Sequence, residues 1–227
     1  MGHYTWLLFD ADGTLFDYDT AERTALERSF HDIGIPFEPA YLATYRRING
    51  QIWIDFEARK ITAERLKSRR FELLFSELQQ SVDAKAFSDQ YLLRLSEATY
   101  LIDGAEVLVK HLASSYQIGI ITNGLTRVQR PRFKASAVAP YIDTMIISEE
   151  LGVAKPDPRI FDAAFEKMQY PSRANVLMIG DSLTSDMQGG HDYGIDTCWF
   201  NPNNTENTFP FQPTYEIRKL SEMFNFL

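Results

Sequence analysis

The sequence has a single cysteine, Cys198, among its 227 residues. One thiol excludes a framework of internal disulfides, so a reducing compartment is expected, and we take the cytoplasm as the expected location. Long apolar runs are also absent. The longest early run, Trp6–Phe9, stops at Asp10, far short of the ~20 residues that span a bilayer. We therefore expect no membrane-spanning segment and no membrane partner.

Basic residues are fewer than acidic residues. The chain has 23 lysines and arginines against 31 acidic residues, a net charge of −8. Such a chain is a poor general binder of nucleic acid polymers, although a local site or a metal can still attract a small phosphorylated substrate. Hydrophobic residues at 44% and charged residues at 24% exclude a collagen-like, low-complexity or disordered chain. At this length, one domain with a sizeable insertion fits best.

Several short apolar runs have the character of buried parallel strands, because they are continuous rather than alternating. They are Thr5–Phe9, Ile118–Ile121, Thr144–Ile147, Val176–Ile179 and Thr197–Phe200. Apolar residues at helical spacing lie between the later runs, and a last short strand is expected at Tyr215–Ile217 after a polar surface loop. Strands that alternate with helices predict a doubly wound, Rossmann-like α/β sheet.

The first interval breaks this alternation. From about Asp17 to Tyr100 the chain has a helical pattern throughout, and roughly 80 residues are too many for a loop. We therefore predict a core of residues 1–16 and 101–227, with residues 17–100 inserted as a helical subdomain. Within the insertion, Asn49-Gly50 is expected to break or bend a helix. The basic run Lys67–Arg70 is expected on a solvated helix face.

Two carboxylates, Asp10 and Asp12, follow directly on the first predicted strand, and Gly13 permits a sharp turn after them. Residues two apart in an extended chain point to the same side. Like charges this close imply a divalent cation. The alternative is an ordinary turn of aspartate and glycine at a strand end.

Polar residues also follow three later strands. Thr122-Asn123-Gly124 offers a hydroxyl, an amide and main-chain N–H groups at a strand-to-helix turn, which suits a phosphate. Lys155 can hold an ammonium near a phosphoryl group, and Asp181 and Asp186 follow Val176–Ile179. Each segment alone also fits a plain turn, an exposed lysine or a helix cap. Together they occupy the sheet edge at which open α/β folds bind ligands.

In this order, the four segments resemble the motifs of the haloacid dehalogenase superfamily. Asp10–Thr14 is similar to its first motif, Thr122 to its second, Lys155 to its third, and Gly180–Asp186 to its fourth. The helical insertion is similar to the C1-type cap of that superfamily. The resemblance covers nearly the whole chain.

The resemblance implies chemistry for the acidic residues. Asp10 would be the nucleophile that forms an aspartyl-phosphate, and Asp12 the general acid and then the general base. Mg²⁺ would be bound by the side chains of Asp10 and Asp181 and by the main-chain carbonyl of Asp12. Phosphatases and phosphomutases of the superfamily carry an aspartate at the position of Asp12, whereas its dehalogenases do not.

The resemblance also implies a phosphate site. Thr122, Asn123 and Lys155 would hold the phosphoryl oxygens. Asp186 would either reach the metal through water or orient Lys155.

Part of the insertion, Asn49–Glu57 together with Arg70–Leu74, is similar to the cap of the pyrimidine 5′-nucleotidase subgroup. In C1-capped relatives the cap selects the substrate, so Arg46, Asn49 and Trp53 are candidate substrate contacts. Trp53 would offer an aromatic platform to a flat group. The alternative for Trp53 is core packing at helical spacing.

We therefore expect a Mg²⁺-dependent phosphomonoester hydrolase, acting on a nucleoside 5′-monophosphate, with a pyrimidine base favoured. Alternative substrates are other small phosphomonoesters, such as a sugar phosphate or phosphoglycolate. A phosphomutase is a further alternative, and a scaffold that keeps the fold without catalysis is the non-enzyme alternative. The expected partner is a small phosphorylated metabolite, and the chain is expected to be a monomer or a homodimer.

Overall fold

The computed structural model describes residues 4–57 and 60–227. The described chain divides into two compact units. The core unit comprises residues up to 18 together with 100–126 and 133–227, and the helical unit comprises residues 19–99 and 127–132. Residues 127–132, which we had expected in the core, group with the helical unit. The division into core and inserted cap as predicted from the sequence stays a prediction.

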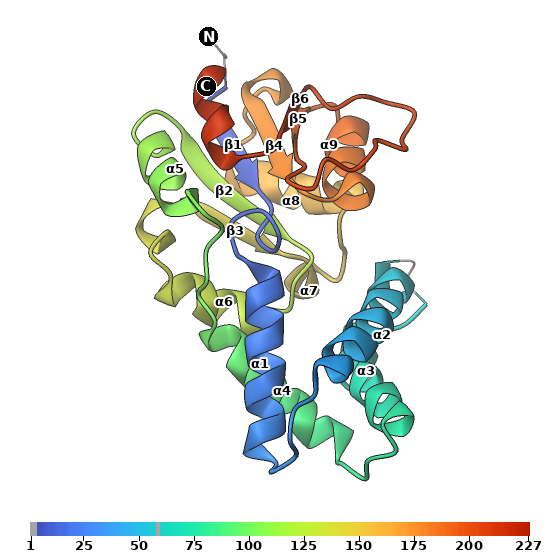
Figure 1. Ribbon diagram of the computed structural model, residues 1–227. Coiled ribbons are helices and arrows are strands. Elements are labelled where there is room, and N and C mark those ends of the chain that lie inside the picture. Colours follow the sequence, from blue (N-terminus) through green and yellow to red (C-terminus); the bar gives the residue numbers. More distant parts are fainter. Residues whose placement is uncertain (1–3, 58–59) are drawn as a thin grey trace. The chain divides into compact units, whose positions relative to one another are not determined.

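A parallel sheet forms the centre of the core unit (Figure 1). Its strands run in the order β3-β2-β1-β4-β5-β6, and Phe9 in β1 pairs with Ile120 in β2 and Ile179 in β4. The central strands are apolar and buried along their length, as expected of strands covered on both faces. The strands are β1 Trp6–Phe9, β2 Gln117–Thr122, β3 Thr144–Ile147, β4 Val176–Gly180, β5 Asp196–Phe200 and β6 Tyr215–Ile217.

Helices cover both faces of this sheet. Leu7 and Phe9 belong to a buried cluster with Leu108 of α5, whereas Leu8 on the opposite face belongs to a cluster with Phe161 of α8. This alternation confirms the predicted doubly wound α/β fold. The helices of the core unit are α5 Ala105–Leu112, α6 Thr126–Ala135 (shared with the helical unit), α7 Ser148–Leu151, α8 Pro158–Lys167 and α9 Gln188–Tyr193.

The crossover from β5 to β6 contains no helix. Asn201, which is buried directly after β5, ties this loop together. Its Nδ2 donates to the Thr205 carbonyl (2.9 Å), and its Oδ1 accepts from the Thr205 N–H (2.9 Å). Phe211 in the same loop stacks on His191 of α9, with ring centroids 4.3 Å apart. The polar loop predicted before the last strand is therefore held by contacts within itself and by a contact with α9.

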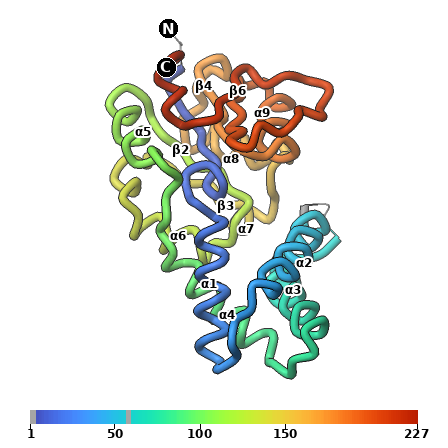
Figure 2. The backbone as a smooth tube through the Cα atoms, viewed as in Figure 1, coloured from blue at the N-terminus to red at the C-terminus, as the bar shows by residue number. Residues whose placement is uncertain are grey.

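The described residues of the helical unit comprise four helices with an aromatic core and residues 127–132 of α6. Figure 2 traces the chain from β1 into α1 and, after α4, on to α5. Thr62 caps the N-terminus of α3, because its hydroxyl accepts from the Arg65 N–H (3.2 Å). Phe30 and Phe87 pack edge to face with centroids 5.1 Å apart. The helices are α1 Tyr18–Asp32, α2 Pro39–Glu57, α3 Ala63–Glu77 and α4 Ala84–Glu97.

Two expectations for the helical unit are wrong. Helix α2 runs without interruption through Asn49 and Gly50. Its neighbours Ile48 and Ile52 are both buried, and their burial outweighs the ~1 kcal/mol that a mid-helix glycine costs relative to alanine. Arg70 does not lie on a solvated face, because it is 1% exposed. Its spacing of four from Leu66 and Leu74 places it on the buried face of α3.

None of the helices in the described part of the chain combines the length and the apolar character that crossing a membrane requires.

Candidate active site

The site begins where β1 ends. From β1 the chain continues to β2 and β3 on one side of the sheet and to β4, β5 and β6 on the other, so β1 lies at the point where the strand order reverses. Ligands of open α/β sheets bind outside the carboxyl ends of the strands at such a point. Asp10 is the first residue beyond β1, and its N–H donates to the Ile179 carbonyl (2.8 Å). Its carboxylate therefore emerges between β2 and β4.

A tight turn follows Asp10. The N–H groups of Leu15 and Phe16 both donate to the Ala11 carbonyl, and the Gly13 N–H donates to the Phe16 carbonyl. Gly13 has φ +84°, and a Cβ at this position would come within 2.5 Å of Asp181 Oδ2. Glycine is thus required both by the left-handed backbone and by the close approach of a carboxylate. Asp12 lies half-buried in this turn.

Lys155 is the cation of the site and is 1% exposed. Its Nζ donates to Asp10 Oδ1 (2.6 Å) and to the Ile121 carbonyl (2.7 Å), and it lies 2.6 Å from Asp186 Oδ1. The three partners match the three donors of an ammonium group. Although burial opposes it, the charges of Asp10 and Asp186 raise the pKa of Lys155 above its ordinary value. Lys155 is therefore held as a cation beside Asp10.

Three carboxylates converge around this lysine. One oxygen from each of Asp10, Asp181 and Asp186 lies within 4.8 Å of the other two. Burial raises the pKa of Asp10 well above its ordinary value, Lys155 opposes the shift, and the charge of Asp186 adds to it. Desolvation and the charge of Asp186 raise the pKa of Asp181 to about 7. Three acidic groups against one ammonium leave an excess of negative charge, and this set of oxygen donors fits a hard divalent cation such as Mg²⁺.

The turn after β4 positions Asp181 and Asp186. Ser182 caps a π-helical turn, Leu183–Met187, and its N–H donates to Asp186 Oδ2 (3.1 Å). A Cβ at Gly180 would overlap the Asp186 carboxylate, so only glycine permits this approach. The indole N–H of Trp199 in β5 donates to the Asp181 carbonyl (2.9 Å). Single-turn π segments are frequent at functional sites.

The residues after β2 complete the cluster. Thr122 is buried, and its hydroxyl accepts from the Gly124 N–H (3.1 Å). Asn123 Nδ2 donates to the Lys155 carbonyl (3.0 Å), and Asn123 Oδ1 accepts from the Lys155 N–H (2.7 Å). The structure thus brings Thr122, Asn123 and Lys155 to the same sheet edge as Asp10, but the amide of Asn123 is bonded to the main chain of Lys155.

The candidate substrate contacts of the insertion lie on α2 of the helical unit. Arg46 Nε donates to Glu22 Oε2 (2.7 Å), and Arg46 also binds the carboxylate of Asp19 (2.8 Å). Asn49 is buried and accepts from Arg70 Nη1 (3.0 Å). Trp53 is half-buried and packs edge to face on Phe56, with centroids 5.6 Å apart. Arg46 and Asn49 therefore have partners within their own unit, and the role of all three as substrate contacts stays a prediction.

Reasoning from the sequence missed two charged residues of this network. Glu22 is 3% exposed, and burial raises its pKa while Arg46 opposes that shift. Arg70 places its guanidinium 5.1 Å from the ring centroid of Phe71 and 5.2 Å from that of Tyr91, close enough for cation–π attraction. The available signal was the helical spacing of Arg70 with the apolar residues of α3.

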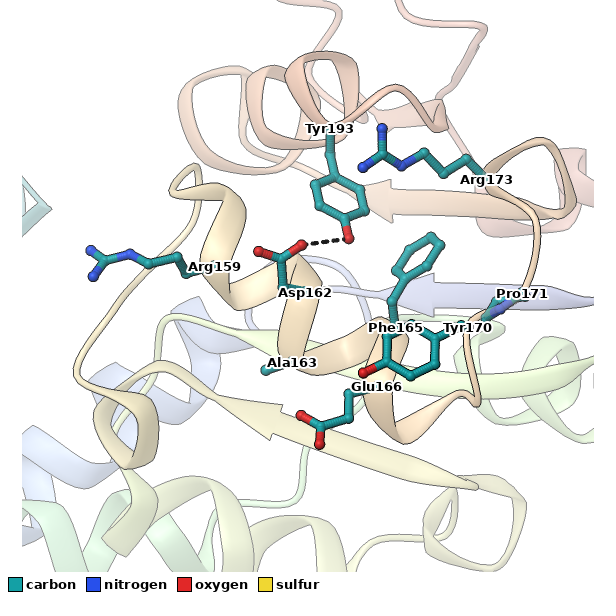
Figure 3. A pocket seen from close by; sticks show the side chains of 9 residues that line it. All are labelled: Arg159, Asp162, Ala163, Phe165, Glu166, Tyr170, Pro171, Arg173 and Tyr193. Carbon is teal, nitrogen blue, oxygen red and sulfur yellow. Dashed lines mark hydrogen bonds between the residues drawn. The ribbon is translucent and has the colours of Figure 1, made fainter.

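A separate groove lies between α8, the loop that follows it and α9 (Figure 3). Three of its polar side chains, those of Asp162, Arg173 and Tyr193, interact with one another. The Tyr193 hydroxyl donates to Asp162 Oδ1 (2.8 Å), and the Arg173 guanidinium lies 4.4 Å from the centroid of the Tyr193 ring. The described lining contains none of the residues predicted for the site. This groove is therefore separate from the cluster around Asp10.

Comparison with known proteins bears on the identity of the site. A sequence profile of the haloacid dehalogenase-like hydrolases matches residues 4–194. The HAD-hydrolase YfnB of Bacillus subtilis strain 168 is 38% identical over 227 residues, which cover 100% of this chain and 97% of YfnB. A crystal structure of YfnB bound to magnesium matches with a TM-score of 0.92 over 98% of this chain and 97% of that one.

Two further relatives carry the name of an activity. The pyrimidine 5′-nucleotidase PynA of Streptococcus pneumoniae is 37% identical over 99% of this chain and 95% of PynA. The pyrimidine 5′-nucleotidase YjjG of Escherichia coli K12 is 35% identical over 97% of this chain and 96% of YjjG. The resemblance predicted from the four motifs and from the insertion is confirmed.

Proposed function

Because the chain belongs to the haloacid dehalogenase-like hydrolases, we propose that the cluster around Asp10 is the active site of a Mg²⁺-dependent phosphatase. Its proposed substrate is a nucleoside 5′-monophosphate with a preference for pyrimidine bases, and the cytoplasm is its expected compartment. One observation carries the proposal. The buried carboxylate of Asp10 is bonded to Lys155 and lies within 4.8 Å of the carboxylates of Asp181 and Asp186.

The proposed reaction proceeds in two displacements at phosphorus. A carboxylate oxygen of Asp10 attacks the phosphorus atom, and the bond from phosphorus to the 5′-oxygen breaks as Asp12 donates its proton to that oxygen. Asp12, now a carboxylate, then takes a proton from a water molecule. The water oxygen attacks the same phosphorus atom, releasing inorganic phosphate and restoring Asp10.

The remaining residues bind and orient. The side chains of Asp10 and Asp181 and the carbonyl of Asp12 would hold Mg²⁺, which when bound supplies positive charge to the phosphoryl oxygens. Thr122 and Lys155 would hold the phosphoryl group. The 2.6 Å separation of Asp186 and Lys155 supports a role for Asp186 in orienting the lysine over a water-mediated contact to the metal.

Two observations support the choice of substrate. Asp12 stands where the resemblance places an aspartate in phosphatases and none in dehalogenases, which favours phosphoryl transfer. The pyrimidine 5′-nucleotidases PynA and YjjG align over nearly the whole chain, including the segment that holds Trp53. The names of these relatives are the support for the pyrimidine preference.

A panel of phosphate esters tests the proposal. Release of phosphate would be measured with Mg²⁺ for UMP, dTMP, CMP, AMP, GMP, phosphoglycolate, a sugar phosphate and p-nitrophenyl phosphate, with Asp10→Asn as the blank. We expect kcat/KM for pyrimidine monophosphates to exceed that for purine monophosphates by at least about tenfold, a difference of ~1.4 kcal/mol. A preference for phosphoglycolate or the sugar phosphate would replace the proposed substrate. No turnover of any ester would leave the non-catalytic scaffold.

A further inference from the structure

We propose that Asn123 is a positioning residue, whose side-chain amide fixes the main chain of Lys155 and does not itself bind the phosphoryl group. The catalytic consequence of this assignment rests on the function proposed above. The placement of Lys155 does not rest on it.

The contact is made at two points. Asn123 Oδ1 accepts from the Lys155 N–H at 2.7 Å, and Asn123 Nδ2 donates to the Lys155 carbonyl at 3.0 Å. One planar amide thus binds both main-chain polar groups of a residue 32 positions away. Turning the amide toward a phosphate would break both hydrogen bonds, and a buried N–H or C=O left without a partner is costly.

The end of β2 also binds the ammonium group at the tip of the Lys155 side chain. The Ile121 carbonyl, two residues before Asn123 in β2, accepts from Lys155 Nζ at 2.7 Å. Lysine has a flexible four-carbon stem, so an ammonium at a fixed place needs a fixed main chain as well as partners at its head. The end of β2 supplies both, one through the carbonyl of Ile121 and the other through the side chain of Asn123.

The fixed end matters because the ammonium has two acidic partners. Lys155 Nζ lies 2.6 Å from both Asp10 Oδ1 and Asp186 Oδ1. If the main chain of residue 155 shifts, the ammonium can keep one carboxylate and lose alignment with the other. Misplacement of a catalytic group by about 1 Å can cost about a hundredfold in rate. Losing a group that acts in the transition state lowers kcat. Losing a contact that contributes equally to the bound substrate and the transition state raises KM instead.

Asn201 provides a matched control. It is a buried asparagine directly after a strand of the same sheet, and it binds the N–H and the carbonyl of Thr205 at 2.9 Å each. Its Nδ2 also donates to Glu216 Oε1 (2.8 Å). Asn201→Ala therefore removes the same kind of two-point contact, with at least equal structural cost, outside the site.

The experiment compares Asn123→Ala with Asn201→Ala on UMP and p-nitrophenyl phosphate in the presence of Mg²⁺. We expect Asn123→Ala to lower kcat by about a hundredfold and to change KM by less than about threefold. Asn201→Ala should lower the melting temperature at least as much and leave kcat near the wild-type value. A rise in KM at unchanged kcat in Asn123→Ala would make Asn123 a direct phosphate ligand and overturn the proposal. Equal losses in the two variants would reduce Asn123 to a structural residue.

Labelling of Lys155 gives a readout that needs no activity. Reductive methylation followed by mass spectrometry measures how fast each lysine reacts. We expect Lys155 to react several-fold faster in Asn123→Ala than in the wild type, and to stay protected in Asn201→Ala. Unchanged protection in Asn123→Ala would contradict the proposal.

Two outcomes need separate treatment: absence of phosphatase activity in the wild type, and failure of Asn123→Ala to fold. If the wild type hydrolyses no phosphate ester, the proposed function fails while the labelling still decides whether Asn123 fixes Lys155. If Asn123→Ala does not fold, Asn123→Asp replaces it, because aspartate keeps the acceptor for the Lys155 N–H and loses the donor to its carbonyl. Lys155 should then be labelled faster in Asn123→Asp than in the wild type and in Asn201→Ala. A rate equal to that of the wild type would overturn the assignment.

Discussion

The core unit and the helical unit each contain a cluster of charged side chains, partly buried in both, but the clusters differ in their balance of charge. In the core unit, Asp10 and Asp186 flank one ammonium, that of Lys155, and Asp181 has a carboxylate oxygen within 4.8 Å of theirs. In the helical unit, the carboxylates of Glu22 and Asp19 face the guanidinium of Arg46, and Asn49 links Glu22 to the guanidinium of Arg70.

The difference shows what each cluster is suited to do. A network whose charges cancel internally has no need of a further ion, and it can serve to hold helices α1, α2 and α3 together. A cluster with surplus carboxylates is unfavourable alone and becomes favourable when a cation binds. The core cluster also lies on turns at strand ends, where side chains can face a ligand, whereas the other lies on the faces of packed helices.

The largest expected effect comes from removing the nucleophile. Asp10→Asn should lower kcat by several orders of magnitude, because an amide oxygen is a poor nucleophile toward phosphorus. The fold should survive, since one of the crowded negative charges is gone and Lys155 keeps Asp186. Steady-state kinetics beside a thermal melt checks both parts. Near-normal turnover by the folded variant would remove Asp10 from the mechanism.

The second largest effect is expected from removal of the metal, which should affect the cluster of the core unit and not that of the helical unit. EDTA should abolish turnover and Mg²⁺ should restore it. Mg²⁺ at about a hundred times its Kd should raise the free energy of unfolding by ~2.7 kcal/mol, which a thermal melt detects. The shift should vanish in Asp181→Asn and persist in Arg70→Ala. Equal shifts in these two variants would mean that the cation binds elsewhere.

The helical cluster should respond in stability rather than in chemistry. Arg70→Ala removes a large side chain that is 1% exposed and packed against Tyr91 and Phe71, so we expect a loss of about 3 kcal/mol in the free energy of unfolding. At a temperature where it is folded, kcat for p-nitrophenyl phosphate should stay within about threefold of wild type. Arg69→Ala is the control, because Arg69 is half-buried and its ion pair with Glu72 remains partly open to solvent, so that it is worth about 1 kcal/mol or less. Similar denaturation midpoints for the two variants would refute the structural role of Arg70.

A smaller effect tests whether the helical unit also takes part in specificity. A base stacked on an aromatic ring gains ~1–3 kcal/mol, so Trp53→Ala should lower kcat/KM for UMP by roughly ten- to a hundredfold. The value for p-nitrophenyl phosphate should barely change. Parallel assays and a melt decide the matter. Equal losses for both substrates, with a lower melting temperature, would return Trp53 to the packing of α2.

The smallest effect concerns pH in the absence of metal. The pKa of Asp181 is raised to about 7 in the folded chain, so between its ordinary value near 4 and pH 7 the folded state binds more protons than the unfolded state. This contribution to stability is present at low pH and is lost as the pH rises through 7. Melts of chelated protein from pH 5 to pH 8 should show a decline that is weaker in Asp181→Asn. Identical slopes would show that Asp181 does not titrate in this range.

Much of the core cluster could be predicted from the sequence, for a physical reason. Buried parallel strands are continuous apolar runs, so β1, β2 and β4 can be recognised in the amino-acid sequence. The carboxyl ends of parallel strands must meet at one edge, so Asp10, Thr122 and Asp181 had to come together once the strands were assigned. The resemblance to a known superfamily then supplied expected roles that spacing alone does not give.

Other features depend on contacts that no local pattern records. The bond from Asn123 to the main chain of Lys155 joins two loops, and either loop alone is an ordinary turn. The continuity of α2 through Gly50 depends on the burial of its neighbours, which overrode a local turn signal. The burial of Arg70 was visible in its helical spacing, but its basic neighbours favoured a solvated face.

Transfer of the phosphoryl group to Asp10 is the central step of the proposed mechanism. Wild-type protein would be mixed with Mg²⁺ and excess UMP, quenched during turnover and treated with borohydride, which reduces an aspartyl-phosphate to homoserine. Peptide mass spectrometry should then find homoserine at position 10, and it should be absent from chelated protein and from Asp10→Asn. Steady hydrolysis of UMP with an unmodified Asp10, or with the modification at Asp12 or Asp181, would contradict the mechanism.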